Sequence, residues 1–175
     1  MSKAFTKDDA GDADRLVVPR APLPEGTPNY VTRRGLRLLR AEQTALERQR
    51  AALHAQGSSD VTAELNALAQ RGAELQARLA SAELVEPPAS LRSEVRFGAS
   101  IRVRHESGKE ATYRIVGVDE ADAASGLLAF SSPLARALLG LRAGDVAKLR
   151  TPRSSEELEL LEVHYTPHDD SDAGD

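Results

Sequence analysis

The hydrophobic positions of this chain fall into two regions with different periods. Between residues 31 and 86 leucines recur every seven residues, at Leu39, Leu46 and Leu53, and no proline interrupts the segment. From Val95 onward, apolar and polar residues alternate in short runs. A seven-residue repeat indicates an amphipathic helix with one narrow apolar seam, whereas alternation indicates strands. The pattern therefore predicts a helical part followed by a β-rich part.

The helical part divides at the polar stretch "HAQGSSD", residues 54–60. A second apolar series follows it at the same spacing, formed by Val61, Leu68, Leu75 and Ala82, with Leu65 and Leu79 on the same face. Thr32 can cap the first helix, and Pro87 cannot continue the second. We therefore predict an antiparallel coiled-coil helical hairpin over residues 30–86, with arms of about 22–25 residues and roughly 33–38 Å.

The β-rich part is predicted to be a small domain over residues 90–167. Its alternating runs are residues 100–106, 110–116, 126–132, 145–150 and 157–165. One short helix is expected at residues 133–139, because Ser132 can cap it, Pro133 suits its first position and Gly140 suits its end. The predicted fold class is α+β, with an antiparallel sheet.

The two ends and the composition add limits. Residues 1–29, with five acidic residues and several Pro and Gly, are expected to be a disordered leader, and residues 168–175, with four Asp, an acidic tail. The chain has no Cys, a net charge of −4 and 3% aromatic residues. Thiolate metal sites and base-stacking platforms are thus disfavoured, as is duplex DNA binding. With no long apolar run, we expect a cytoplasmic monomer without membrane contact or cofactor.

Several segments resemble one known family. The stretches "NYVTRRGLRLLRAE", "YRIVGVDEAD", "SSPLARALLGLRAGD" and "RTP" resemble the Gre-type bacterial transcription elongation factors, GreA and GreB. The resemblance implies a helical hairpin joined to an FKBP-like domain that docks on RNA polymerase at the rim of its secondary channel. Nucleic acid would be contacted only indirectly, through the transcription complex. The implied docking segment comprises Ser132, Pro133, Leu134, Ala135 and Arg136.

The hairpin tip departs from that family. Gre factors carry a tip signature of the form Gly-Asp-x-x-Glu-Asn-Ala-Glu-Tyr, whose acids help to hold a second Mg²⁺ of the polymerase. Here the tip reads "HAQGSSDVTAEL", and its nearest acids are Asp60 and Glu64, four residues apart. The span also looks shorter than in cleavage factors by roughly two turns per arm, or about 10 Å. We therefore predict a regulator that is not an enzyme, holds no metal and does not stimulate transcript cleavage.

Two other functional interpretations stay open. One is a cleavage-stimulating Gre factor whose displaced acidic tip, Asp60 with Glu64, still reaches the polymerase active site. The other is an Rnk-type regulator of nucleoside diphosphate kinase, since "ALLGLRAGD" and "LELLEVHYTP" resemble that group as well.

A basic patch is expected at the start of the first helix. It comprises Arg33, Arg34, Arg37 and Arg40. It is either a solvated face that balances nearby acids such as Glu42 and Glu83, or a contact for an acidic partner surface or a nucleic-acid backbone.

Overall fold

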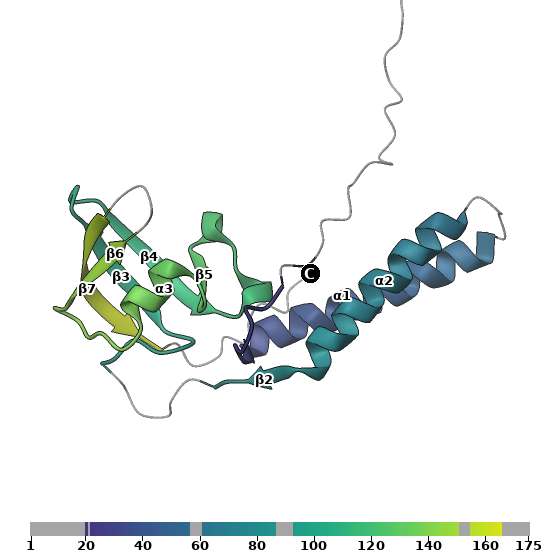
Figure 1. The fold of residues 1–175 in the computed structure, drawn as a ribbon, viewed down its shortest axis with the longest axis horizontal. Helices are drawn as coiled ribbons and strands as arrows, with labels where there is room; N and C mark the ends of the chain where they lie inside the picture. The colour runs from purple at the N-terminus through teal and green to yellow at the C-terminus, as the bar shows by residue number, and fades with distance from the viewer. Residues whose placement is uncertain (1–19, 21, 57–60, 87–92, 151–154, 166–175) are drawn as a thin grey trace, which may run out of the picture.

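The computed structural model describes residues 20, 22–56, 61–86, 93–150 and 155–165, and the fold has two parts. A pair of long helices lies side by side and projects from a small sheet domain (Figure 1). The elements are, in chain order, β1 (Asn29–Val31), α1 (Arg33–Gln56), α2 (Thr62–Ala80), β2 (Ala82–Leu84), β3 (Ser100–His105), β4 (Glu110–Val116), the 3-10 turns η2 (Val118–Glu120) and η3 (Ala123–Ser125), β5 (Leu127–Ala129), α3 (Pro133–Leu138), β6 (Val146–Arg150) and β7 (Ser155–His164). Helices and sheet together confirm the predicted α+β class.

The helix pair is held by the leucines that the seven-residue spacing singled out. Leu39, Leu46 and Leu53 of α1 are at most 8% exposed, and Leu75 of α2 is 1% exposed. Burying one leucine side chain is worth about 1.5–3 kcal/mol. A seam this narrow leaves most of both helices in contact with solvent, so the pair depends on the sheet domain at its base.

The second helix ends earlier than expected. It stops at Ala80, and Ala82, which the heptad spacing placed on the seam, belongs to β2 instead. The side chain of Asn29 explains the change, because its amide nitrogen donates to the carbonyl of Arg78 at 2.8 Å and to the hydroxyl of Ser81 at 3.1 Å. This contact occupies a free carbonyl at the helix end and places β1 parallel to β2.

The N-terminal boundary also differs from the expected one. Strand β1 begins at Asn29, the last residue of the predicted leader. Residues 1–19 and 21 of that leader lie outside the described residues, as do residues 168–175 of the predicted acidic tail. The described part of the leader packs along α2, where Arg20 and Leu23 border a hollow with Ala77.

The sheet of the second domain is mixed rather than antiparallel, which corrects the prediction. Its strand order is β5-β4-β3-β7-β6, and β4 pairs in parallel with β5, whereas the other three pairings are antiparallel. The reason lies in the connection over residues 117–126, which contains η2 and η3. This loop carries the chain back along β4 before β5 begins, so a hairpin turn does not form there.

Helix α3 forms where a short helix was predicted, one residue shorter than the expected 133–139, and it closes the core of the sheet domain. Its Ala135 and Leu138 are fully buried, together with Ile101 of β3 and Leu160 of β7. Gly140, just beyond the helix, has a φ of 86°, the left-handed conformation that glycine adopts without strain. Within the described ranges, no helix has the length and apolarity needed to cross a bilayer.

Candidate partner interface

The candidate docking segment is a rigid turn of helix on the sheet domain. The hydroxyl of Ser132 accepts a hydrogen bond from the amide of Ala135 at 3.2 Å, so Ser132 caps α3 and Pro133 follows at its first position. Ala135 is fully buried and Leu134 packs against the core. Pro133 and Arg136 are the exposed members of the segment. A partner can therefore reach those two side chains, while the other three shape and hold the turn.

The surroundings of α3 offer an apolar contact as well. Helix α3 packs against β6, and Val146, the first residue of that strand, is 50% exposed. An exposed apolar side chain on an element next to the docking segment suits a protein–protein contact, in which an apolar anchor sits within a polar rim. No chemistry beyond binding follows from these groups.

The hairpin tip is only partly described. Asp60 lies outside the described residues, so its position relative to Glu64 is not part of the structure. Glu64 is exposed in the first turn of α2. Among the described residues there is no cluster of three or more His, Cys, Asp or Glu able to hold a metal ion. The pairing of Asp60 with Glu64 therefore stays a prediction.

The predicted basic patch is partly neutralised within the chain. Arg33 forms an ion pair with Glu86 at 2.5 Å, and Arg34 forms one with Glu120 at 3.0 Å. Neither of these partners is one of the acids named from the sequence, Glu42 and Glu83. Arg40 is exposed on the same helix. Arg33 and Arg34 therefore join structural contacts at the base of the hairpin.

A buried polar junction, which the sequence reasoning missed, links the hairpin to the sheet domain. The hydroxyl of Thr32 donates to the carboxylate of Glu120, whose side chain is 2% exposed, and Arg34 pairs with the same carboxylate. A Cβ atom on Gly35 would lie 2.8 Å from that carboxylate, which explains the glycine. The segments "VTRRG" and "VGVDE" thus meet in space.

The same junction has a backbone and an aromatic side. A Cβ atom on Gly117 would lie 2.6 Å from the carbonyl oxygen of Tyr30, so only glycine allows these two backbone segments to approach this closely. The ring of Tyr30 packs against Phe97 and Phe130 of the sheet domain, with centroids 5.8 and 5.4 Å apart. The sequence held one hint of this junction. The segments "VTRRG" and "VGVDE" both lie in stretches that resemble the same family.

Asp119, the other acidic residue of η2, forms ion pairs with two arginines. Asp119 pairs with Arg20 at 2.5 Å and with Arg78 of α2 at 3.3 Å, and Arg20 also pairs with Glu42 of α1 at 2.5 Å. Burial acts to raise the pKa of the Glu42 carboxyl, but the hydrogen bonds and charges of Arg20 and Arg71 outweigh it and hold that pKa below its ordinary value. These groups fix the base of the hairpin.

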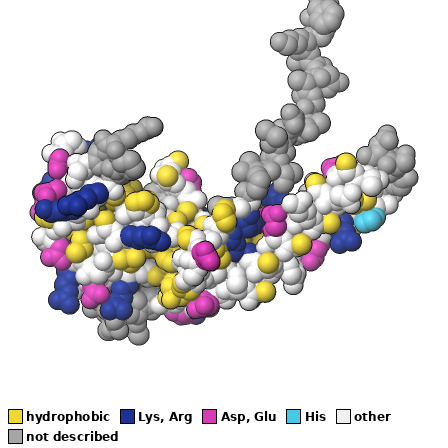
Figure 2. Space-filling model, in the orientation of Figure 1, with side chains coloured by type: hydrophobic (Ala, Val, Ile, Leu, Met, Phe, Trp, Pro, Cys, Tyr) yellow, Lys and Arg dark blue, Asp and Glu magenta, His cyan; other side chains and the backbone are white. Residues whose placement is uncertain are grey.

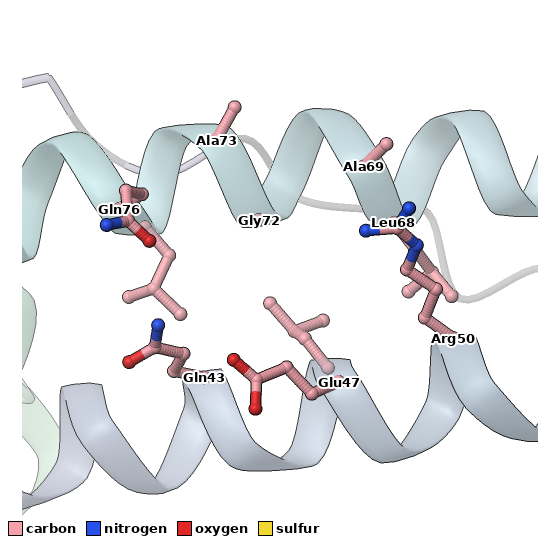
Figure 3. Close-up of a pocket in the computed structure, with 10 residues that line it drawn as sticks. Gln43, Glu47, Arg50, Leu68, Ala69, Gly72, Ala73 and Gln76 are labelled. Atoms are coloured by element: carbon pink, nitrogen blue, oxygen red, sulfur yellow. The ribbon is translucent and has the colours of Figure 1, made fainter.

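A groove runs between the two helices on one face of the hairpin. It measures about 320 Å³ and has Leu46, Leu68 and Leu75 among its lining residues. Figure 3 shows Gln43 and Glu47 of α1 on one side and Ala69, Gly72 and Ala73 of α2 on the other. A Cβ atom on Gly72 would meet nothing within 4 Å, so the structure gives no packing reason for this glycine.

The surface carries charges of both signs. In the view of Figure 2, dark blue Lys and Arg side chains alternate with magenta Asp and Glu side chains over the sheet domain and along the hairpin. On the sheet, Arg102 pairs with Glu110 and Glu162, and Arg104 pairs with Glu110 and Glu159. The sheet surface around Arg102 and Arg104 therefore carries paired charges of both signs, and it does not form a continuous basic surface that could bind a phosphate backbone.

The family model and the similar proteins all name the same family. The family model for "Transcription elongation factor, GreA/GreB, C-term" matches residues 90–165. The GreA of Ralstonia nicotianae is 37% identical over 153 residues, covering 77% of this chain and 96% of that protein. The GreA of Alkalilimnicola ehrlichii is 42% identical over 95 residues, covering 53% of this chain and 60% of that protein. The chain thus matches between about three-fifths and nearly all of these relatives' lengths.

A solved structure gives a looser match. The GreA factor homolog 1 of Thermus thermophilus is 21% identical, with coverage of 79% of this chain and 99% of that chain. The TM-score is 0.37, so this overlay carries no argument about function.

Proposed function

We propose that this chain, which belongs to the GreA/GreB family of transcription elongation factors, regulates transcription by binding bacterial RNA polymerase at its secondary channel without stimulating transcript cleavage. The chain performs no catalysis of its own in this proposal. It acts by occupying the channel entrance, where the hairpin would take the place of a cleavage-competent factor. Contact with nucleic acid would arise only through the transcription complex.

The observation that carries the proposal is a match to the family's C-terminal domain combined with an altered tip. The family match spans residues 90–165, which include α3 and the exposed Arg136. The tip between α1 and α2 reads "HAQGSSDVTAEL" and lacks the paired acids of the cleavage factors. Metal-assisted phosphodiester cleavage needs oxygen ligands held within about 0.5 Å of their working positions. A chain without those ligands can bind but has nothing to offer the second Mg²⁺.

The two parts have distinct roles in this proposal. We interpret the helix pair as a coiled-coil hairpin, supported by the buried series Leu39, Leu46 and Leu53. We interpret the sheet domain as FKBP-like and as the docking unit, supported by the rigid cap of Ser132 on α3. The hydrogen bond of Thr32 to Glu120 then joins the base of the hairpin to the docking unit.

The test is an assay on stalled, backtracked transcription complexes. The protein alone is expected to leave the transcript uncleaved beyond the polymerase's own rate. When it is titrated against an active Gre factor, cleavage should fall in proportion to its concentration over its dissociation constant, because the two proteins compete for one site. The control is a complex with the active factor and an equal amount of an unrelated acidic protein.

Two outcomes would contradict the proposal. Cleavage by the protein alone that disappears in Asp60→Ala would restore the cleavage-factor interpretation. Neither cleavage nor competition, together with no co-purification with core polymerase, would point to a different partner such as the one that Rnk-type regulators use.

A further inference from the structure

Arg20 connects two carboxylates that belong to different parts of the molecule. One terminal nitrogen donates to Asp119 of η2 at 2.5 Å, and the other donates to Glu42 of α1 at 2.5 Å. The side chains of Arg20, Asp119 and Glu42 are 17%, 8% and 25% exposed. A guanidinium with one arm on each of two half-buried carboxylates is a stronger contact than an exposed ion pair, because solvent screens it less.

Each of the two carboxylates also pairs with a second arginine. Asp119 keeps Arg78 at 3.3 Å, and Glu42 keeps Arg71 at 3.0 Å, and both of these arginines belong to α2. Losing a partner from a buried charge is costly when the charge is left alone. Here both acids stay paired when Arg20 leaves, so this contact can open without disrupting the fold around it.

The contact also lies well away from the other link between α1 and η2. Arg34 in the first turn of α1 already binds Glu120, whereas Glu42 lies eight residues further, which is about 12 Å along the helix axis. A helix attached at one end can rock about that end, while a second attachment 12 Å away resists rocking. Arg78, two residues before the end of α2, also holds Asp119, but it does so at the base of the hairpin. Arg20 supplies the attachment further along, at Glu42, and in Figure 1 the purple start of the described chain lies between the hairpin base and the sheet domain.

We propose that Arg20 is a strap that sets the angle between the hairpin and the sheet domain by holding Asp119 and Glu42 together. With the strap closed, the hairpin has one direction. With the strap open, the helix pair rocks about the junction at Thr32 and Glu120, and several directions are populated. This device goes beyond the proposed polymerase contact, since it operates within the free protein.

The experiment measures the distance between the two parts directly. The chain has no Cys, so Arg48→Cys on α1 and Lys109→Cys in the turn after β3 give two unique, exposed labelling sites. Nitroxide labels at these sites report a distance distribution by pulsed electron paramagnetic resonance. The doubly labelled chain is compared with the same chain carrying Arg20→Ala. The matched control is Arg40→Ala, which removes the same charge from an exposed position on α1.

The strap predicts a narrow distribution for the parent chain and for Arg40→Ala. It predicts a distribution at least twofold wider, or a second maximum, for Arg20→Ala. Arg20→Lys should give an intermediate width, because one ammonium group cannot reach both carboxylates in the same fork geometry. Identical distributions for the parent chain and Arg20→Ala would overturn the proposal.

A melting curve accompanies each variant. If Arg20→Ala abolished the cooperative transition, Arg20 would be a structural residue and the strap would be wrong. No polymerase is present in these measurements. Their failure would therefore leave the proposed function untouched, and a failed cleavage competition would leave the strap untouched.

Discussion

The hydroxyl of Thr32 donates a hydrogen bond to the buried carboxylate of Glu120, which lies 88 residues later in the chain. The same hydroxyl accepts a hydrogen bond from the amide of Gly35 at 2.9 Å. A threonine hydroxyl can do both at once, since it is a donor and an acceptor. One side chain therefore caps α1 and ties the hairpin to the turn η2, so the start of the hairpin and the sheet domain form one joint.

Replacing that hydroxyl should destabilise the whole protein. Thr32→Ala removes a helix cap and leaves the buried Glu120 carboxylate with one fewer donor, so we expect a loss of about 1–3 kcal/mol in the free energy of unfolding. Urea denaturation monitored by circular dichroism measures it. Thr44→Ala is the control, because the Thr44 hydroxyl is exposed and bonds only to the carbonyl of Arg40 within α1. Equal losses in the two variants would show that the joint contributes nothing.

Two glycines should respond in opposite directions to the same substitution. Gly117→Ala is expected to lower the free energy of unfolding by about 1–3 kcal/mol, because its Cβ atom would sit 2.6 Å from a backbone oxygen that cannot move freely. Gly72→Ala should raise it by about 0.5–1 kcal/mol, because Gly72 lies inside α2 with nothing within 4 Å. Thermal melts of both variants test the pair. A loss for Gly72→Ala would mean that its groove is tighter than the structure shows.

The sequence predicted the features that local rules control. The heptad leucines Leu39 and Leu46 gave the seam, and Ser132 with Pro133 gave the start of α3, because each depends on residues within a few turns. The joint was not predictable in this way. No local pattern marks Glu120 for burial, because its partner Thr32 lies 88 residues earlier in the chain.

The remaining differences have the same origin. The end of α2 at Ala80 is set by Asn29, and the parallel pairing of β5 is set by the path of the loop before it. For the candidate docking segment, the charge of Arg136 already favoured its exposure, and the structure agrees, but the full burial of Ala135 and the exposure of Pro133 did not follow from the sequence. Orientation depends on which face the core covers, and that is decided by strands far away in the chain.

Lowering the pH should reduce the free energy of unfolding, in part through protonation of Glu42. The pKa of its carboxyl in the folded protein lies below the ordinary value of 4.5, because the hydrogen bonds and charges of Arg20 and Arg71 outweigh burial. Its ionised form therefore stabilises the fold at neutral pH, and this contribution is lost as the pH falls below about 4.5 and through the lowered folded pKa. Glu42→Gln should be less stable than the parent at pH 7, with the difference shrinking towards pH 3. Melting temperatures across this range test it, with Glu47→Gln, which removes an exposed carboxylate from the same helix, as the control.

Charge reversal on α3 should separate docking from stability. Arg136 is exposed on a helix whose cap and core contacts involve other residues, so Arg136→Glu should change the free energy of unfolding by less than about 0.5 kcal/mol. If α3 docks on an acidic surface of the polymerase, the same variant should weaken binding by roughly tenfold or more, because it places like charges together at the contact. Arg150→Glu reverses an exposed charge on β6 of the same domain and is the matched control. Binding is measured by titration against core polymerase. Equal weakening in both variants would indicate only a general electrostatic attraction, and an unchanged affinity for Arg136→Glu would remove this residue from the docking surface.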